Sequence, residues 1–90
     1  MEVSFSEQFK KAYQKRIGKD ALSKNAFKQA VELFKTNPFD ARLKTHKLSG
    51  KLKGLLSFSV TYNIRVVFYF TDDQPQKALF VNIGDHDEVY

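Results

Sequence analysis

The amino-acid sequence predicts an α+β fold, with two antiparallel helices packed on one face of a small, mostly antiparallel sheet. Three observations carry this prediction. Apolar residues recur at helical spacing in the first part of the chain, and at the every-second-residue spacing of strands in the later part. The 90 residues, 42% of them hydrophobic, suffice for one core of two layers. We therefore expect a single domain over residues 1–90, in the order β-α-α-β-β-β.

The first two elements are a short strand at residues 2–5 and an amphipathic helix. Ser6 stands where a helix N-cap belongs, and Glu7 follows in the first turn, where negative charge is favoured. Gly18 ends this helix. Its apolar stripe, with spacings of four, consists of Phe9, Tyr13 and Ile17.

A second helix is expected between Asp20, which can cap its N-terminus, and Asn37. Pro38 stops it, because proline disfavours helical geometry in the residue before it. The very short connection between the two helices predicts that they pack as an antiparallel pair. The apolar face of the second helix consists of Leu22, Ala26, Phe27, Ala30, Val31, Leu33 and Phe34.

Three strands joined by turns are expected in the later part of the chain. Residues 56–61 alternate apolar with hydroxyl side chains, which indicates a half-buried strand. Residues 64–70 are apolar on nearly both faces, which predicts a central strand, and residues 78–83 form a third strand closed by Gly84. The hydroxyl side chains make the second face of the sheet polar, and no helix is expected to cover it.

The charge of the chain is distributed unevenly. Residues 1–53 carry thirteen Lys and Arg against five Asp and Glu, a net +8, whereas residues 54–90 carry two against five, a net −3. Five basic residues follow one another with no acid between them, which is a candidate footprint for a phosphate backbone; the alternative is a solvated basic loop. This basic cluster consists of Arg42, Lys44, Lys47, Lys51 and Lys53.

The composition excludes several classes of protein. With no Cys there is neither a disulfide framework nor a thiolate metal site, and two His are too few for a convincing metal site. The N-terminal residues lack the apolar core of a signal peptide, and no stretch approaches the ~20 apolar residues of a membrane span. We therefore expect a cytoplasmic protein with no membrane association, no metal and no other cofactor.

Arg65 stands out because it interrupts the apolar central strand. A buried, unpaired guanidinium is costly, so the side chain requires an anionic partner or a solvated cleft. One interpretation is structural, an ion pair with Asp85 or Asp87. The other is functional, since a planar guanidinium on a rigid strand can hold a phosphate through two hydrogen bonds.

Two further segments carry candidate functional side chains. In residues 83–90, IGDHDEVY, His86 lies between Asp85 and Asp87, which suits a proton donor near neutral pH, although a polar tail is the simpler interpretation. In residues 46–54, HKLSGKLKG, the two lysines spaced two apart would project to the uncovered face if they begin the strand. A solvated edge is the alternative there.

Together these residues match the requirements of RNA cleavage without a metal. A base must take the proton of the ribose 2′-hydroxyl, which then attacks the neighbouring phosphate. Cations must hold the charge that builds up on the phosphate oxygens, and an acid must protonate the departing 5′-oxygen. The two His, Arg65, the two lysines and Tyr90 all fall at the ends or on the open face of one small sheet.

The runs HKLSGKLKG, NIRVVFYF and IGDHDEVY resemble the RelE/ParE toxin superfamily, and most closely its YafQ-like branch. The resemblance spans the chain and is most specific in the last run. It implies the toxin of a type II toxin–antitoxin system, with a cognate antitoxin as partner. It also implies a metal-independent endoribonuclease that cuts mRNA, at the ribosome in the typical case.

The resemblance also assigns roles to residues of this chain. His46 opens the H-x-L-x-G motif, His86 corresponds to the general acid, and Arg65 to the arginine that binds the phosphate. Lys51 and Lys53 match paired basic positions, and Tyr90 the terminal aromatic residue. Further His and Asp residues of YafQ-like enzymes are replaced here by Ser59 and Asn63. These replacements leave the general base open between His46, Asp85 and Asp87.

Two alternatives belong to other functional classes. A ParE-like toxin would inhibit a topoisomerase by binding it, or the chain would be a relative without catalysis. Neither has a need for His86 beside two aspartates, nor for His46 together with Arg65, which favours the nuclease. A plain RNA-binding module is the third interpretation, but the chain lacks the exposed aromatic pattern of single-strand binders.

Overall fold

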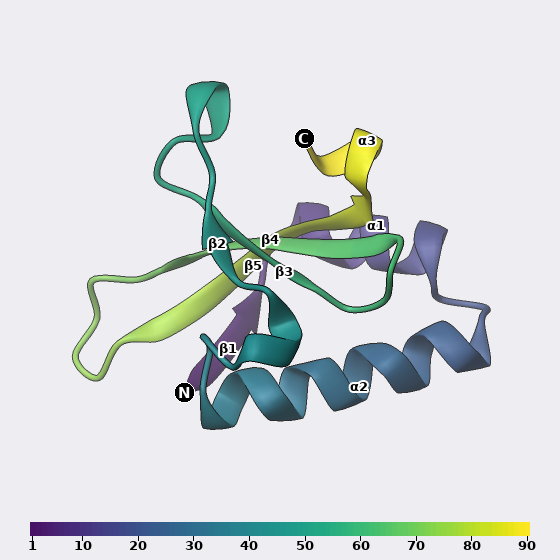
Figure 1. Ribbon diagram of the computed structural model, residues 1–90, viewed down its shortest axis with the longest axis horizontal. Coiled ribbons are helices and arrows are strands. Elements are labelled where there is room, and N and C mark those ends of the chain that lie inside the picture. The colour runs from purple at the N-terminus through teal and green to yellow at the C-terminus, as the bar shows by residue number, and fades with distance from the viewer.

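The computed structural model describes all 90 residues, Met1–Tyr90, and Figure 1 shows their arrangement. The chain begins with β1 (Glu2–Phe5), α1 (Glu7–Arg16) and α2 (Ala21–Thr36). It continues with the 3₁₀ turn η1 (Ala41–Leu43), β2 (His46–Lys47) and a second 3₁₀ turn, η2 (Gly50–Leu52). It ends with β3 (Leu56–Ser59), β4 (Ile64–Phe70), β5 (Lys77–Asp85) and α3 (His86–Val89).

The strands form one sheet in the order β1-β5-β4-β3-β2. All neighbours are antiparallel except β1 and β5, which are parallel. The α+β class and the predicted β-α-α-β-β-β order are confirmed, with β2 and α3 as two short additions. None of the helices has both the length and the apolar character that a membrane span requires.

The helix ends follow from local chemistry, as predicted. The Ser6 side chain accepts a hydrogen bond from the Phe9 amide at 3.0 Å and thereby caps α1. The Asp20 side chain accepts one from the Leu22 amide at 3.1 Å and caps α2. The Ser23 hydroxyl also donates to Asp20, and this bond is the main reason why the Asp20 pKa lies below its usual value. These caps satisfy amide groups that have no partner inside the helix.

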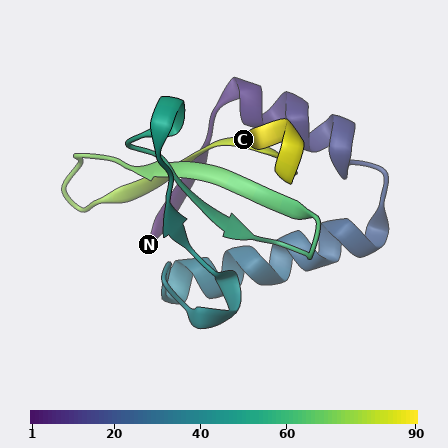
Figure 2. The same ribbon diagram turned by 45° about the horizontal axis from the view of Figure 1, so that its top comes forward.

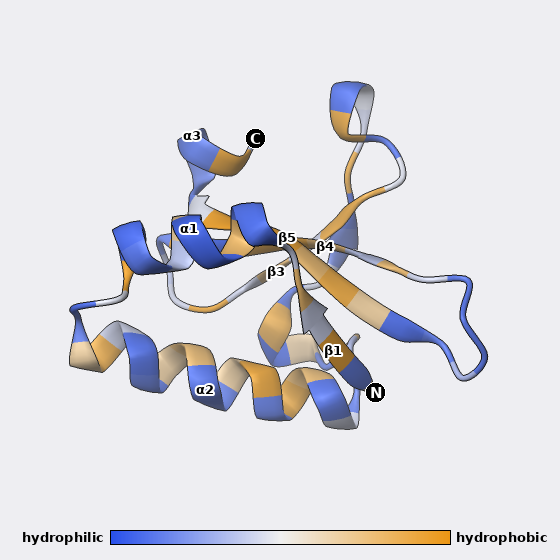
Figure 3. Cartoon of the chain, turned by 180° about the vertical axis from the view of Figure 1, so that it is seen from behind, coloured by the Kyte–Doolittle hydropathy of each residue, from blue (hydrophilic) through white to orange (hydrophobic).

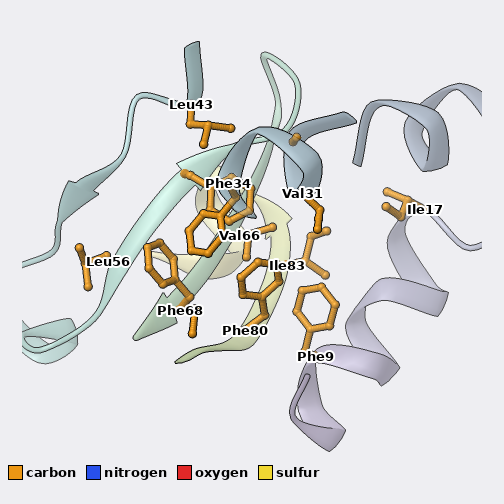
Figure 4. Packing of buried hydrophobic residues seen from close by; sticks show 13 residues of the cluster. Phe9, Ile17, Val31, Phe34, Leu43, Leu56, Val66, Phe68, Phe80 and Ile83 are labelled. Carbon is orange, nitrogen blue, oxygen red and sulfur yellow. The ribbon is translucent and has the colours of Figure 1, made fainter. Parts of the chain in front are cut away.

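The core lies between the two long helices and one face of the sheet. The Phe34 ring of α2 lies 5.1, 4.9 and 5.3 Å from the rings of Phe58, Phe68 and Phe80. Figure 4 shows Phe34 of α2 meeting Phe68 and Phe80 of the strands, and Figure 3 shows hydrophobic colour concentrated on the central strands. Phe9 of α1 joins the core through the ring of Phe80, at 5.7 Å. The predicted packing of both helices on this face is confirmed.

The first helix also closes an edge of the sheet. At its N-terminal end the Ser6 amide donates to the Phe80 carbonyl, and at its C-terminal end Arg16 pairs with Asp85. Since β1 ends at Phe5, opposite Phe80, α1 runs along the part of β5 that β1 leaves unpaired. This position brings the end of α1 beside the end of β5.

A β-bulge divides β5. Val67 of β4 pairs with Asn82, whereas the next residue, Phe68, pairs with Phe80, so that Val81 has no partner. The extra residue allows both Phe80 and Ile83 to face the core, although they are three positions apart. Regular alternation would have placed one of them on the opposite face.

The expectation that the second face of the sheet stays uncovered is wrong at its centre. Figures 1 and 2 show α2 on one side of β4 and the short helix α3 on the other. Val89 of α3 is buried, and Ser57 of β3 is fully buried beneath the chain end. The strand predicted to close at Gly84 continues to Asp85, where α3 begins.

Candidate active site

The strand register gathers several predicted residues on the open face, by which we mean the sheet face opposite α2. His46 pairs with Ser57, and Arg65 pairs with Ser59 on one side and Gly84 on the other. Paired residues project to the same face, so these side chains form two adjacent rows. The short strand β2 therefore brings His46 to the sheet, although no alternating pattern of apolar residues marks this position in the sequence.

A single helical turn places His86 over this face. The Glu88 amide donates to the Asp85 side chain at 3.0 Å, and the Asp85 amide donates to the Glu88 side chain at 2.8 Å. This reciprocal capping box stabilises the turn that begins with His86. Gly84 leaves room for it, because a Cβ atom on Gly84 would lie 2.9 Å from the Glu88 Oε1 atom and 3.3 Å from a Val89 methyl carbon.

Tyr90 lies between the two histidines. Its hydroxyl is hydrogen-bonded to the Ser57 hydroxyl, which fixes the end of the chain to β3. Its ring meets the His86 ring edge-on, with the centroids 4.5 Å apart, and lies 6.4 Å from the His46 ring. The structure thus brings both predicted histidines to one aromatic side chain.

The His46 ring is oriented by the backbone. Its Nδ1 atom lies 3.0 Å from the Lys44 carbonyl oxygen. A carbonyl oxygen can only accept, so in this contact Nδ1 carries the hydrogen. The neutral ring then has Nε2 as a free acceptor, as a general base requires.

The His86 ring is largely exposed, and its two neighbouring aspartates differ in their surroundings. The Asp87 carboxylate is fully exposed and lies 3.8 Å from His86 Nδ1. The Asp85 carboxylate instead caps α3 and contacts the Arg16 guanidinium at 3.3 Å. Asp87 is therefore the only aspartate with a carboxylate within ion-pair distance of the imidazole.

Arg65 is held without a carboxylate. Its Nη1 atom donates to the Thr61 carbonyl at 2.9 Å, and the guanidinium takes part in no ion pair. Neither structural partner considered from the sequence, Asp85 or Asp87, pairs with it. The half-buried guanidinium consequently retains hydrogen-bond donors that face a groove.

Two grooves meet at His86. The first, of about 580 Å³, will be called the Arg65 groove, and the second, of about 450 Å³, the Lys51 groove. His86 lines both. The Arg65 groove is also lined by Arg16, Tyr62, Asn63, Arg65, Asp85 and Asp87. The Lys51 groove is also lined by His46, Lys47, Ser49, Lys51, Leu52 and Tyr90.

The structure divides the basic cluster. Lys47 and Lys51 line the Lys51 groove, whereas Lys53 lies in an adjoining hollow beside Lys47. Lys44 contributes its carbonyl to His46, and its side chain lines neither groove. Arg42 lies in a different hollow, formed mainly by α2 residues.

Arg42 is occupied by a neighbouring acid. Its Nε and Nη2 atoms donate to the two Asp40 carboxylate oxygens at 3.0 and 2.9 Å. These bonds lower the pKa of Asp40 to about 2 and raise the pKa of Arg42. Since its guanidinium is already paired, Arg42 is the member of the basic cluster least available to a phosphate.

The condition under which Lys51 and Lys53 would share a face, that they begin the strand, is not met. Lys51 lies in η2, Lys53 follows it, and the strand itself begins at Leu56. The cause is a loop that turns at Gly50 and Gly54, where φ is +65° and +95°, values that favour glycine.

Three residues of this region were not singled out from the sequence. Arg16 comes from the end of α1, and no sequence pattern links it to the chain end. Ser57 belongs to the face that was expected to be uncovered, and Tyr62 directly follows the strand predicted at residues 56–61. The Tyr62 side chain is 91% exposed. The spacing of Asp85 and Glu88 was the available signal for α3, because an acid followed three residues later by Glu is typical of a capping box.

A comparison with protein families decides the identity. The family model described as "Bacterial toxin of type II toxin-antitoxin system, YafQ" matches residues 1–90. The chain belongs to this family. It is therefore a type II toxin–antitoxin toxin, and the predicted YafQ-like branch is confirmed. No curated protein matches the chain.

Solved structures agree with membership of the YafQ family. YafQ from E. coli is 26% identical, with a TM-score of 0.74 over 99% of this chain and 97% of that one. YafQ in the E. coli DinJ–YafQ toxin–antitoxin complex is also 26% identical, with a TM-score of 0.72 over 99% and 96% of the two chains. The YoeB/ParE toxin from Agrobacterium tumefaciens is 20% identical and shares the fold, with a TM-score of 0.79 over 96% and 99%.

Proposed function

We propose that this toxin is a metal-independent endoribonuclease that cuts mRNA by attack of the RNA's own 2′-hydroxyl. The observation that supports it best is the position of His86 where two grooves meet. One groove offers the unpaired guanidinium of Arg65, and the other offers His46 with Lys47 and Lys51. An RNA strand lying along both grooves would pass with its scissile phosphate beside His86.

The reaction divides between the two histidines. His46 Nε2 takes the proton of the 2′-hydroxyl, and the resulting oxygen forms a bond to the adjacent phosphorus. The bond from phosphorus to the 5′-oxygen breaks, and His86 donates a proton to that oxygen. The products are a 2′,3′-cyclic phosphate and a 5′-hydroxyl. Arg65 and Lys51 stabilise the negative charge of the phosphate oxygens in the transition state.

His46 is a better candidate for the base than either aspartate. The Asp85 carboxylate is engaged by the Glu88 amide and by Arg16. The Asp87 carboxylate is fully exposed, and water would compete for any proton transfer there. His46, by contrast, has one nitrogen fixed by a carbonyl and the other free.

The proposal extends to the partners and the place of action. We propose mRNA in the cytoplasm as the substrate, with cleavage at the ribosome. The cognate antitoxin is the proposed inhibitor, and the structure of the E. coli DinJ–YafQ complex supports an antitoxin that binds the folded toxin directly. For this chain we propose that the antitoxin blocks the two grooves.

The test is cleavage of mRNA by the purified protein, with and without EDTA. We expect discrete cuts that persist in EDTA and leave a 2′,3′-cyclic phosphate. His86→Ala should reduce the rate by about 10²–10⁴-fold, because it removes one proton-transfer group. Thermal melts should show an unchanged fold, since the His86 side chain is largely exposed.

Two outcomes would contradict the proposal at different points. Cleavage by His86→Ala at the wild-type rate would remove His86 from the mechanism. A wild-type protein that stops growth but never cuts RNA would replace the nuclease by a ParE-like toxin that binds a topoisomerase.

A further inference from the structure

Arg16, at the end of α1, joins the two carboxylates of the α3 capping box. Its Nε atom lies 2.7 Å from Glu88 Oε1, and its Nη2 atom lies 3.3 Å from Asp85 Oδ2. One planar guanidinium therefore bridges both members of the box from outside. The Arg16 side chain is 33% exposed, and the Asp85 and Glu88 side chains that it contacts are 43% and 38% exposed.

α3 depends on contacts of this kind because it is only four residues long. A helix of one turn does not form by itself, since its nucleation costs more than its few hydrogen bonds return. The C-terminal end of α3 is fixed by the buried Val89 and by the bond between Tyr90 and Ser57. The N-terminal end, which carries His86, continues directly from β5, where Asp85 pairs with Ile64, and Arg16 is the side chain that contacts it from α1.

The charges around α3 add a second reason. Asp85, Asp87 and Glu88 follow one another within four positions, and like charges so close together repel. Arg16 is the only Lys or Arg side chain that forms an ion pair with any of them. It thus neutralises the end of the helix from which the His86 ring projects.

We propose that Arg16 is a positioning residue, which holds α3 so that His86 lies where the Arg65 and Lys51 grooves meet. The inference rests on the proposed nuclease function, because it assigns Arg16 a task in that reaction. Arg16 also lines the Arg65 groove, so direct contact with RNA is the competing role. The two roles differ in kinetics: loss of positioning lowers kcat, whereas loss of an RNA contact raises KM.

The experiment compares Arg16→Ala and Arg16→Lys with Lys15→Ala as the matched control. Lys15 is the neighbouring cation in the last turn of α1 and forms no ion pair. We expect Arg16→Ala to lower kcat by about 10²-fold, as a misplaced catalytic group does, with KM and melting temperature close to those of Lys15→Ala. Arg16→Lys should recover only part of kcat, because an ammonium group lacks the planar fork. Added ethylguanidinium should partly restore Arg16→Ala.

A second measurement on the same proteins needs no RNA. NMR relaxation and amide exchange should show a mobile segment at residues 86–87 in Arg16→Ala, with Val89 and Tyr90 still held by their own contacts, and an ordered segment in Lys15→Ala and the wild type. An ordered segment in Arg16→Ala, an unchanged kcat, or a change in KM alone would each overturn the proposal. If the wild type cuts no RNA, the proposed function fails, and the NMR comparison still decides whether Arg16 orders α3.

Discussion

Arg65 lies directly opposite Gly84 in the β4–β5 ladder, so its partner on that strand has no side chain. On its other side it pairs with Ser59, which is small as well. An arginine on a central strand thus has small neighbours on both sides of the ladder and no carboxylate within ion-pair distance. Its one hydrogen bond goes to a backbone carbonyl, that of Thr61.

This surrounding predicts that Arg65 matters more to activity than to stability. Arg65→Ala should reduce cleavage by about 10²-fold, through loss of a donor to the phosphate oxygens. The free energy of unfolding should fall by only about 0.5–1.5 kcal/mol, the contribution of one hydrogen bond. Single-turnover cleavage and denaturant unfolding check the two values. A large loss of stability would show that the guanidinium serves the fold instead.

Because the hydroxyls of Tyr90 and Ser57 are paired, substitutions of these two residues should have non-additive effects on the free energy of unfolding. Tyr90→Phe leaves the fully buried Ser57 hydroxyl without its partner, which should cost about 1–3 kcal/mol. Adding Ser57→Ala removes the orphaned group and should recover most of that loss. Unfolding of both single variants and the double variant completes the cycle; additive costs would contradict a direct bond.

Phe34 tests the core. Phe34→Ala should cost about 3–5 kcal/mol, a large share of the stability of a domain of this size, because the ring is fully buried among three others. Leu22→Ala, on the same helix, is the control. Leu22 is 83% exposed, although the helical spacing placed it on the apolar face, and the change should stay within about 0.5 kcal/mol. Urea denaturation measures both.

The effect of substituting a basic residue on RNA affinity should depend on where that residue lies. Lys51→Glu should weaken binding of single-stranded RNA. It should also make the negative slope of log K against log salt less steep by about 0.7, the value for one phosphate contact. Arg42→Glu should change neither, because Arg42 lies in another hollow and is paired with Asp40. Fluorescence anisotropy over a salt series distinguishes them. Equal effects would indicate general attraction to a basic protein.

The sequence predicted those parts of the fold that local chemistry determines. Ser6 and Asp20 cap the long helices, and the change from helical to alternating spacing marks the beginning of the sheet. β2 and α3 were not predicted, because two and four residues are too few to show a periodic pattern of apolar side chains. They form through contacts with distant parts of the chain.

The candidate site was predictable in its residue types but not in its geometry. His46, His86, Arg65 and Tyr90 were recognised by their chemistry and by family resemblance, and the structure brings them to one face. Their mutual positions depend on strand register, and Arg16 reaches the site only because α1 runs beside β5. No spacing in the sequence reports such a contact between residues 69 positions apart.

The bulge at Val81 determines which face of the sheet each later residue of β5 projects to. With regular pairing through that point, the same sequence would turn Ile83 toward the grooves and Gly84 toward the core. A chain lacking Val81 would keep every other residue of the strand on its present side. At this one position β5 can lose a residue and keep both faces as they are, although the hydrogen bond from the Ser6 hydroxyl to the Val81 carbonyl would be lost. A further inserted residue would instead exchange the lining of the grooves with that of the core.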